Sequence, residues 1–166
     1  MNIQKLSTLY NVRILNNDDA LAVYDLCKQN TAYYKHCPPF VTIESIRKDM
    51  TALPPRKSIE DKFYIGYFDN DKLIAVLDLI LNFPNESTAF VGFFMLDISI
   101  QHKGIGTGIV DELCAYLHDL GYAHIRLGWV DGNQRSEHFW HKNGFIETGA
   151  VSKTEYYSII YAQKEI

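Results

Sequence analysis

The sequence is poor in cysteine and carries no excess of positive charge. Its three cysteines, Cys27, Cys37 and Cys114, are an odd number without C-x-x-C spacing, which argues against a disulfide framework and against a thiolate zinc site. Lysine and arginine number 16 against 20 aspartate and glutamate, giving a net charge of −4. A general nucleic-acid binder needs a basic surface to neutralise phosphates. We therefore expect no nucleic-acid partner and a reducing, cytoplasmic location.

Long hydrophobic runs are also lacking. The longest, residues 90–96, is much shorter than the ~20 residues that cross a bilayer. Residues 1–10 are polar and lack the apolar core of a signal peptide. We expect no membrane association. The chain has 166 residues, 47% of them apolar, which suits one domain over 1–166 with a substantial buried core.

Hydrophobic periodicity predicts a series of strands and helices along the chain. Alternating or apolar runs predict strands over 11–15, 62–68, 72–81, 88–100, 123–130, 145–151 and 155–164. Helical spacing predicts helices over about 20–27, from about 42 until Pro54-Pro55, over 104–120 and over 133–142, with a loop at 31–40. The order β-α-α-β-β-β-α-β-α-β-β indicates an α/β fold: a mixed sheet of about seven strands, flanked on both faces by about four helices.

A glycine-rich segment, residues 101–108, lies between a predicted strand and the clearest predicted helix. Glycine allows a sharp turn and close approach of a ligand, and the free N–H groups of a first helical turn suit a pyrophosphate. Lys103 adds a positive charge. Neither G-x-x-x-x-G-K-[ST] nor G-x-G-x-x-G is present. Taken alone, the segment also fits a helix start without any ligand.

Two motifs, the glycine-rich segment and a second one further along the chain, resemble those of the GNAT acetyltransferase superfamily. The family's loop, Q/R-x-x-G-x-G/A, is matched by Gln101, Gly104 and Gly106. Its next motif, one helix and one strand later, is matched by Asn133, Ser136, Phe139, Trp140, Gly144 and Phe145. The resemblance is specific over residues 90–147 and agrees with the element order over nearly the whole chain. It implies a single GNAT-like domain that uses acetyl-CoA as co-substrate.

The resemblance also implies cofactor contacts. Pantetheine would pair with backbone groups near Met95, Leu96 and Ile98, in a gap between two strands. Asn133 would touch the pantetheine arm and Trp140 would flank the thiol end, although the Phe139–Trp140 pair also fits core packing. The pyrophosphate would bind Gln101, His102, Lys103, Gly104, Ile105, Gly106 and Thr107.

The catalytic acid departs from the family pattern. Many members have a tyrosine at the Trp140 position as the proposed acid. An indole N–H can donate a hydrogen bond but does not give up its proton near neutral pH, so Trp140 cannot act as that acid. A thiol of pKa about 8.5 is already a good leaving group, so water or a nearby tyrosine could supply the proton. Tyr157 is the candidate we name first, with Tyr33 or Tyr34 as others. Each could instead pack with its hydroxyl satisfied.

The sequence leaves the identity of the catalytic base open. Asp78 lies inside an apolar strand, where a carboxylate is costly unless it is paired or protonated, so we name it as a candidate base and expect a raised pKa. It could instead face solvent or anchor a loop, and Asp97 is a similar candidate. No pair of histidines has a convincing ligand spacing, so we predict no metal.

The resemblance places Tyr33, Tyr34 and Pro39 on the acceptor side. Tyrosines there could seat a cation or simply pack. We expect transfer of acetyl to an amine of an unidentified small molecule or peptide by direct attack in a ternary complex. The alternative is an acyl-CoA-binding sensor or regulatory domain without turnover. A homodimer is left open.

Overall fold

The computed structural model describes all 166 residues and has the expected α/β architecture. One seven-stranded sheet has the order β1-β2-β3-β4-β5-β7-β6. Only the β4–β5 pair is parallel. The strands are β1 (Asn11–Ile14), β2 (Lys62–Asp69), β3 (Lys72–Ile80), β4 (Thr88–Leu96), β5 (His124–Val130), β6 (Ile146–Lys153) and β7 (Ser158–Glu165). The helices are α1 (Ala20–Cys27), α2 (Thr31–His36), α3 (Ile43–Asp49), α4 (Ile105–Asp119) and α5 (Gln134–Lys142). None of the helices is both long and apolar enough to cross a bilayer.

Three predicted elements are wrong in detail. The predicted loop at 31–40 begins with helix α2, so five helices flank the sheet where about four were expected. The helix predicted to run until Pro54 ends at Asp49, where the Met50 N–H bonds carbonyls of the last turn. The strand predicted over 88–100 ends at Leu96. The Asp97 carboxylate accepts the Ser99 N–H and starts a short 3-10 turn over Ile98–Ile100, because aspartate readily forms such local bonds.

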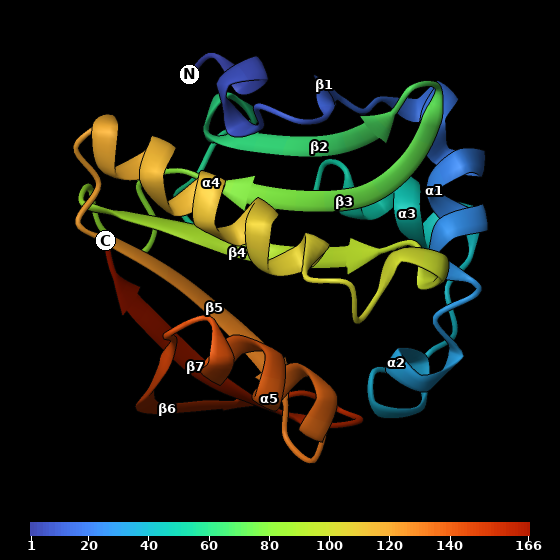
Figure 1. The fold of residues 1–166 in the computed structure, drawn as a ribbon. Coiled ribbons are helices and arrows are strands. Elements are labelled where there is room, and N and C mark those ends of the chain that lie inside the picture. Colours follow the sequence, from blue (N-terminus) through green and yellow to red (C-terminus); the bar gives the residue numbers. More distant parts are fainter.

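Helices pack on both faces of the sheet and bury two separate cores. Successive side chains of a strand point to opposite faces, so adjacent residues of β3 enter different cores. Leu77 packs with the apolar side of α4, and Val76 packs with α1 and α3. Figure 1 shows α4 in front of strands β2 to β4 and α3 behind them.

A β-bulge at Gly92 changes which way β4 points its side chains. Asp78 pairs with Phe93 while Leu79 pairs with Val91, so Gly92 has no partner on β3. Val91 therefore lies in the core beneath α4, whereas Met95, four residues on, lies in the other core. One extra residue reverses the alternation.

The same strand separates from β5. The two strands pair only where residues 88–91 meet residues 124–127. Beyond this point β4 stays with β3 as far as Leu96, and β5 stays with β7 as far as Val130. Figure 1 shows them diverging toward the end of the sheet where α2 and the first turn of α4 lie. The divergence exposes backbone groups in the middle of the sheet.

Candidate active site

A groove of about 790 Å³ runs past the end of β4, the glycine-rich loop and the first half of α5. It brings together ten of the twelve residues predicted to bind the cofactor. Lys103 and Ile105 do not line it, because the Lys103 side chain is exposed and Ile105 packs against the core beneath α4. The ten lining residues are Met95, Leu96, Ile98, Gln101, His102, Gly104, Gly106, Thr107, Asn133 and Trp140.

The glycine loop has the geometry expected of an anion site. Gly104 caps α4 with φ of +82°, a left-handed conformation that glycine adopts without strain. The first bond of α4 runs from the Gly108 N–H to the Gly104 carbonyl. The N–H groups of residues 105–107 therefore have no partner within the helix. A Cβ on Gly106 would lie 2.8 Å from Leu96 Cδ1 and 3.2 Å from Phe139 Cε2, so a larger side chain there would have to displace both.

Two basic side chains, unpredicted as a pair, meet across this groove. Arg135 Nη2 lies 3.0 Å from His102 Nε2, and both residues line the groove. Arg135 lies two residues after Asn133, in the first turn of α5, which could have marked it as a candidate. No residue near it in the sequence indicates that its side chain reaches the glycine loop.

The end of β4 is secured by two amides, of which Asn30 is unpredicted. Asn30 Nδ2 donates to the carbonyls of Leu26 and Leu96. Gln101 Nε2 donates to Asn30 Oδ1 at 2.6 Å and to the Leu96 carbonyl at 3.1 Å. Gln101 thus orders the loop and the strand end. Its interaction with Asn30, 71 residues away, leaves no mark in the sequence.

Backbone direction on β4 decides which peptide groups face the opening. The Asp97 N–H donates to the Ile74 carbonyl on β3. Because N–H and C=O groups of alternate residues point the same way along a strand, Met95 also faces β3. The peptide groups of Phe94 and Leu96 face the gap left by β5.

A smaller pocket of about 170 Å³ lies where β4 and β5 separate. Its walls are segments 91–94 of β4 and 127–130 of β5, with Tyr33, Cys37, Ser136, Trp140, Tyr157 and Ile159. Tyr33, Phe94, Ser136 and Trp140 line this pocket and also the groove. The two spaces are therefore adjacent. A ligand threaded along the groove would present its end to the pocket.

The comparisons with known proteins identify the family. A family model described as "Acetyltransferase (GNAT) family" matches residues 23–145. The chain belongs to the GNAT acetyltransferase family. It is an acetyl-CoA-dependent N-acetyltransferase, as the resemblance of its two motifs predicted. No protein of curated function matches its sequence.

Solved structures share the GNAT fold at low sequence identity. An acetyltransferase from Thermus thermophilus is 15% identical with a TM-score of 0.76, over 95% of this chain and 97% of that one. PaiA N-acetyltransferase from Thermoplasma acidophilum, in complex with coenzyme A, is 20% identical with a TM-score of 0.67, over 95% and 99%. AAC(6')-Ib, in complex with ribostamycin and coenzyme A, is 16% identical with a TM-score of 0.71, over 94% and 93%. At these identities the likeness shows the fold alone.

Tyr157, the first candidate for the GNAT proton donor, lines the pocket opposite Trp140. Its hydroxyl accepts a hydrogen bond from Cys37 Sγ at 3.3 Å, so its own O–H stays available to a ligand. The interaction with Cys37, followed by burial, raises the pKa of Tyr157 to about 12. Full proton transfer to a thiolate of pKa about 8.5 is then uphill, whereas hydrogen-bond donation to it is not.

Trp140 combines the two roles considered for it. It is buried, and its ring centroid lies 5.1 Å from that of Phe145 and 4.9 Å from that of Phe139. It also lines both spaces of the GNAT site. Phe139 stacks on Phe94 at 6.1 Å, so the aromatic group supports the wall of the pocket.

Asp78, the candidate base, forms a buried ion pair. Both its carboxylate oxygens accept from Lys62 Nζ, at 2.7 and 2.8 Å, and the side chains of Lys62 and Asp78 are 1% and 12% exposed. Burial raises the pKa of Asp78, although Lys62 acts to lower it. Asp78 lines neither space. It touches the pocket wall from behind, where a Cβ on Gly92 would lie 2.7 Å from Asp78 Oδ2. Its role as base stays a prediction.

Asp97 anchors a turn. Its carboxylate binds Lys72 Nζ at 2.8 Å and accepts from the Ser99 N–H. Burial acts to raise the pKa of Asp97, but the bonds from Lys72 and Ser99 outweigh it and the pKa is lowered. The carboxylate lies outside the pocket and the groove.

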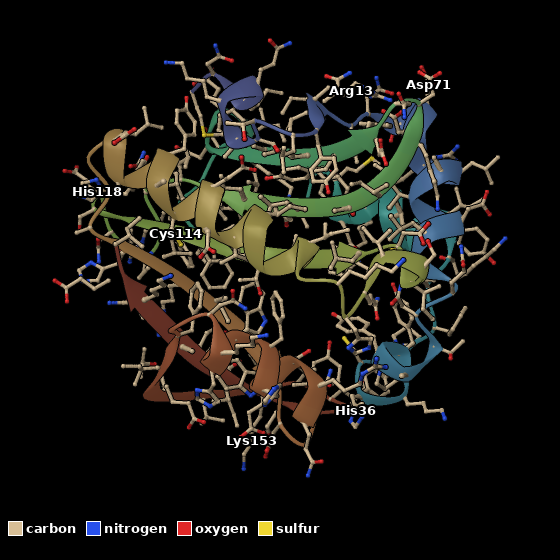
Figure 2. All side chains as sticks on the ribbon, viewed as in Figure 1. Arg13, His36, Asp71, Cys114, His118 and Lys153 are labelled. Carbon is tan, nitrogen blue, oxygen red and sulfur yellow. The ribbon has the colours of Figure 1, made fainter.

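The remaining candidates lie around the site. Tyr34 and Pro39 line neither space, and the Tyr34 ring packs against Tyr33 and Phe40, each at 5.0 Å. Cys114 lies on the side of α4 that faces the sheet (Figure 2), in the core, as expected of a filler residue. Burial raises the pKa of its thiol, which suits no acyl-enzyme nucleophile.

Proposed function

We propose that the chain transfers acetyl from acetyl-CoA to an amine of a small molecule or peptide, by direct attack in a ternary complex. The observation that carries this is that the long groove and the pocket between β4 and β5 lie side by side and share Tyr33, Phe94, Ser136 and Trp140 as lining residues. Acetyl-CoA lying in the groove would bring its thioester to the place where β4 and β5 separate. The acceptor amine would meet it there.

The groove residues supply the cofactor contacts. The N–H groups at the start of α4 would bind the pyrophosphate, helped by the helix dipole. Arg135 adds a charged donor on the opposite wall. Pantetheine would pair with the Leu96 N–H and the peptide groups of Phe94, since the Leu96 carbonyl already accepts from Asn30 and Gln101. A β4 N–H aimed at the thioester oxygen would stabilise the negative charge that develops on it.

The reaction follows from these positions. A neutral amine attacks the thioester carbonyl, the C–N bond forms, the C–S bond breaks, and coenzyme A leaves as a thiolate. Tyr157 donates a hydrogen bond to the thiolate. The proton that the amine nitrogen loses on attack ends on the sulfur, so the products are the amide and the thiol of coenzyme A. No carboxylate lines the pocket. The ammonium form of the acceptor would therefore lose its first proton to water, unless Asp78 acts across Gly92.

Thiol release tests the proposal. Acetyl-CoA affinity is measured by calorimetry and coenzyme A release is followed with a thiol reagent across a panel of primary amines. Tyr157→Phe should lower kcat at least tenfold with acetyl-CoA affinity unchanged. Tyr156→Phe is the matched control, because Tyr156 is 63% exposed. Binding of acetyl-CoA without amine-dependent thiol release would contradict the proposal and favour a sensor role.

The location proposed for the protein remains the cytoplasm. All three cysteines are free thiols, which supports a reducing compartment.

A further inference from the structure

We propose that the acceptor amine is carried by a compact apolar group, a single aromatic ring or a branched alkyl chain, and not by a polycation. This inference rests on the proposed function, because it takes the pocket between β4 and β5 to be the acceptor site. It names the substrate class of that site.

The pocket offers no counter-charge. Eleven of its 14 lining residues are hydrophobic. No aspartate, glutamate, lysine, arginine or histidine is among them. Its polar side-chain groups are uncharged: the hydroxyls of Tyr33, Ser136 and Tyr157, the thiol of Cys37, and the indole N–H groups of Trp129 and Trp140. Burial raises the pKa of Tyr33 well above its usual value of 10, so this phenol stays neutral.

The two buried carboxylates of the chain, Asp78 and Asp97, are already neutralised. Asp49 has no ion-pair partner and acts electrostatically on Tyr157, but it lines neither space. Asp78 gives both oxygens to Lys62, and Asp97 binds Lys72 and Ser99. Neither can serve a second cation without leaving its partner buried and unpaired. A ligand with several ammonium groups would thus lose hydration without gaining ion pairs.

The size of the pocket sets the size of the group. Its volume of about 170 Å³ is close to the ~150 Å³ of an apolar cavity that binds benzene. Drug-sized ligands occupy about 300–1,000 Å³. The pocket thus holds one ring or a short branched chain beside the thioester, and the edge-on Tyr33–Phe93 pair, 6.0 Å apart, forms an aromatic wall.

A comparison of four amines tests the inference. Thiol release from acetyl-CoA is measured with benzylamine and isobutylamine, and with the polycations spermidine and ribostamycin. We expect kcat/KM to be at least tenfold higher for the better of the two apolar amines than for either polycation. A polycation that matches or exceeds them overturns the inference and leaves the transferase function standing. Acetyl-CoA binding without thiol release for any amine overturns both.

A pair of variants locates the site. Phe93→Ala should raise KM for benzylamine at least tenfold and leave KM for acetyl-CoA unchanged, because Phe93 lines the pocket and not the groove. If the alanine variant fails to fold, Phe93→Leu takes its place. It keeps more of the packing and should raise KM for benzylamine by a smaller factor. Phe40→Ala removes a nearby ring that lines neither space and is 47% exposed, and it should change neither KM. Unchanged KM for benzylamine in a folded Phe93 variant contradicts the assignment.

Discussion

The buried Lys62–Asp78 pair allows a test of structure and catalysis together. Asp78→Asn removes the charge that compensates Lys62, whose side chain is only 1% exposed. Leaving one member of such a pair buried and unpaired costs about 3–5 kcal/mol. Lys62→Met leaves the carboxylate unpaired and should cost a similar amount. The double variant buries neither charge and should recover most of the stability.

The measurement is urea unfolding at pH 7, followed by tryptophan fluorescence. From the three variants a double-mutant cycle gives the coupling energy, which for residues in contact ranges over about 0.5–3 kcal/mol. Because each single variant should lose about 3–5 kcal/mol and the double variant only a small part of that, we expect a coupling energy above this range; both oxygens of Asp78 bind Lys62. A loss below about 1 kcal/mol in Asp78→Asn, well under the range for buried pairs, would refute the reasoning.

Turnover of the same variants separates two roles of Asp78. Asp78→Asn should lower turnover at least tenfold with acetyl-CoA affinity little changed. Because Asp78 lines neither space and lies behind the Gly92 bulge, we expect the double variant to regain turnover along with stability. A folded double variant that stays tenfold slower would instead support Asp78 as the general base.

Three further predictions concern the loop, the aromatic wall and the N-terminal edge. Gly106→Val should weaken acetyl-CoA binding at least tenfold, about 1.4 kcal/mol. Gly108→Ala is the control and should not weaken it, because a Cβ at 108 meets nothing within 4 Å. Calorimetry measures both affinities, and equal values would show that the loop does not bind the cofactor. Trp140→Phe should keep most of the turnover. Trp140→Ala should lower the free energy of unfolding by about 3–5 kcal/mol, because it leaves a cavity. A Phe variant that is stable but a hundredfold slower would show a chemical role for the indole N–H. Arg13 hydrogen-bonds Asp19 and lowers its pKa below the usual 3.8, so this carboxylate stabilises the fold above about pH 4 and the effect fades as pH falls through and below that value. In urea unfolding, Asp19→Asn should therefore cost up to about 1 kcal/mol at pH 6 and nothing near pH 2; a difference that persists in acid would contradict the ion-pair explanation.

The fold and the cofactor groove could largely be predicted from the sequence because their signals are local. Periodicity marks helices and strands, and a glycine with positive φ must stand where Gly104 caps α4. Asn133 likewise caps the start of α5 by accepting the Ser136 N–H. Helix α2 escaped prediction because its six residues are too few to show a period, and the two prolines that follow suggested a loop.

The pocket between β4 and β5 could not be predicted as a whole, because it is made of contacts between distant segments. Cys37 and Tyr157 are 120 residues apart and meet only once β7 lies beside β5. A bulge at Gly92 reverses the alternation of β4, so no count along that strand from its start could place Phe93 or Met95 on the correct face.

The sequence by itself determined that this is an α/β chain with a glycine-led helix start after the fourth strand, since glycine, capping residues and periodicity act within a few positions of one another. Tertiary structure alone decided what the carboxylates and tyrosines do. Asp78 became half of an ion pair because antiparallel pairing set β2 against β3 and let Lys62 reach its carboxylate. Tyr157 entered the pocket because β4 and β5 part after four residues of pairing. Register and strand separation are long-range properties, and they fix which side chains share a buried space and therefore which charges are neutralised there.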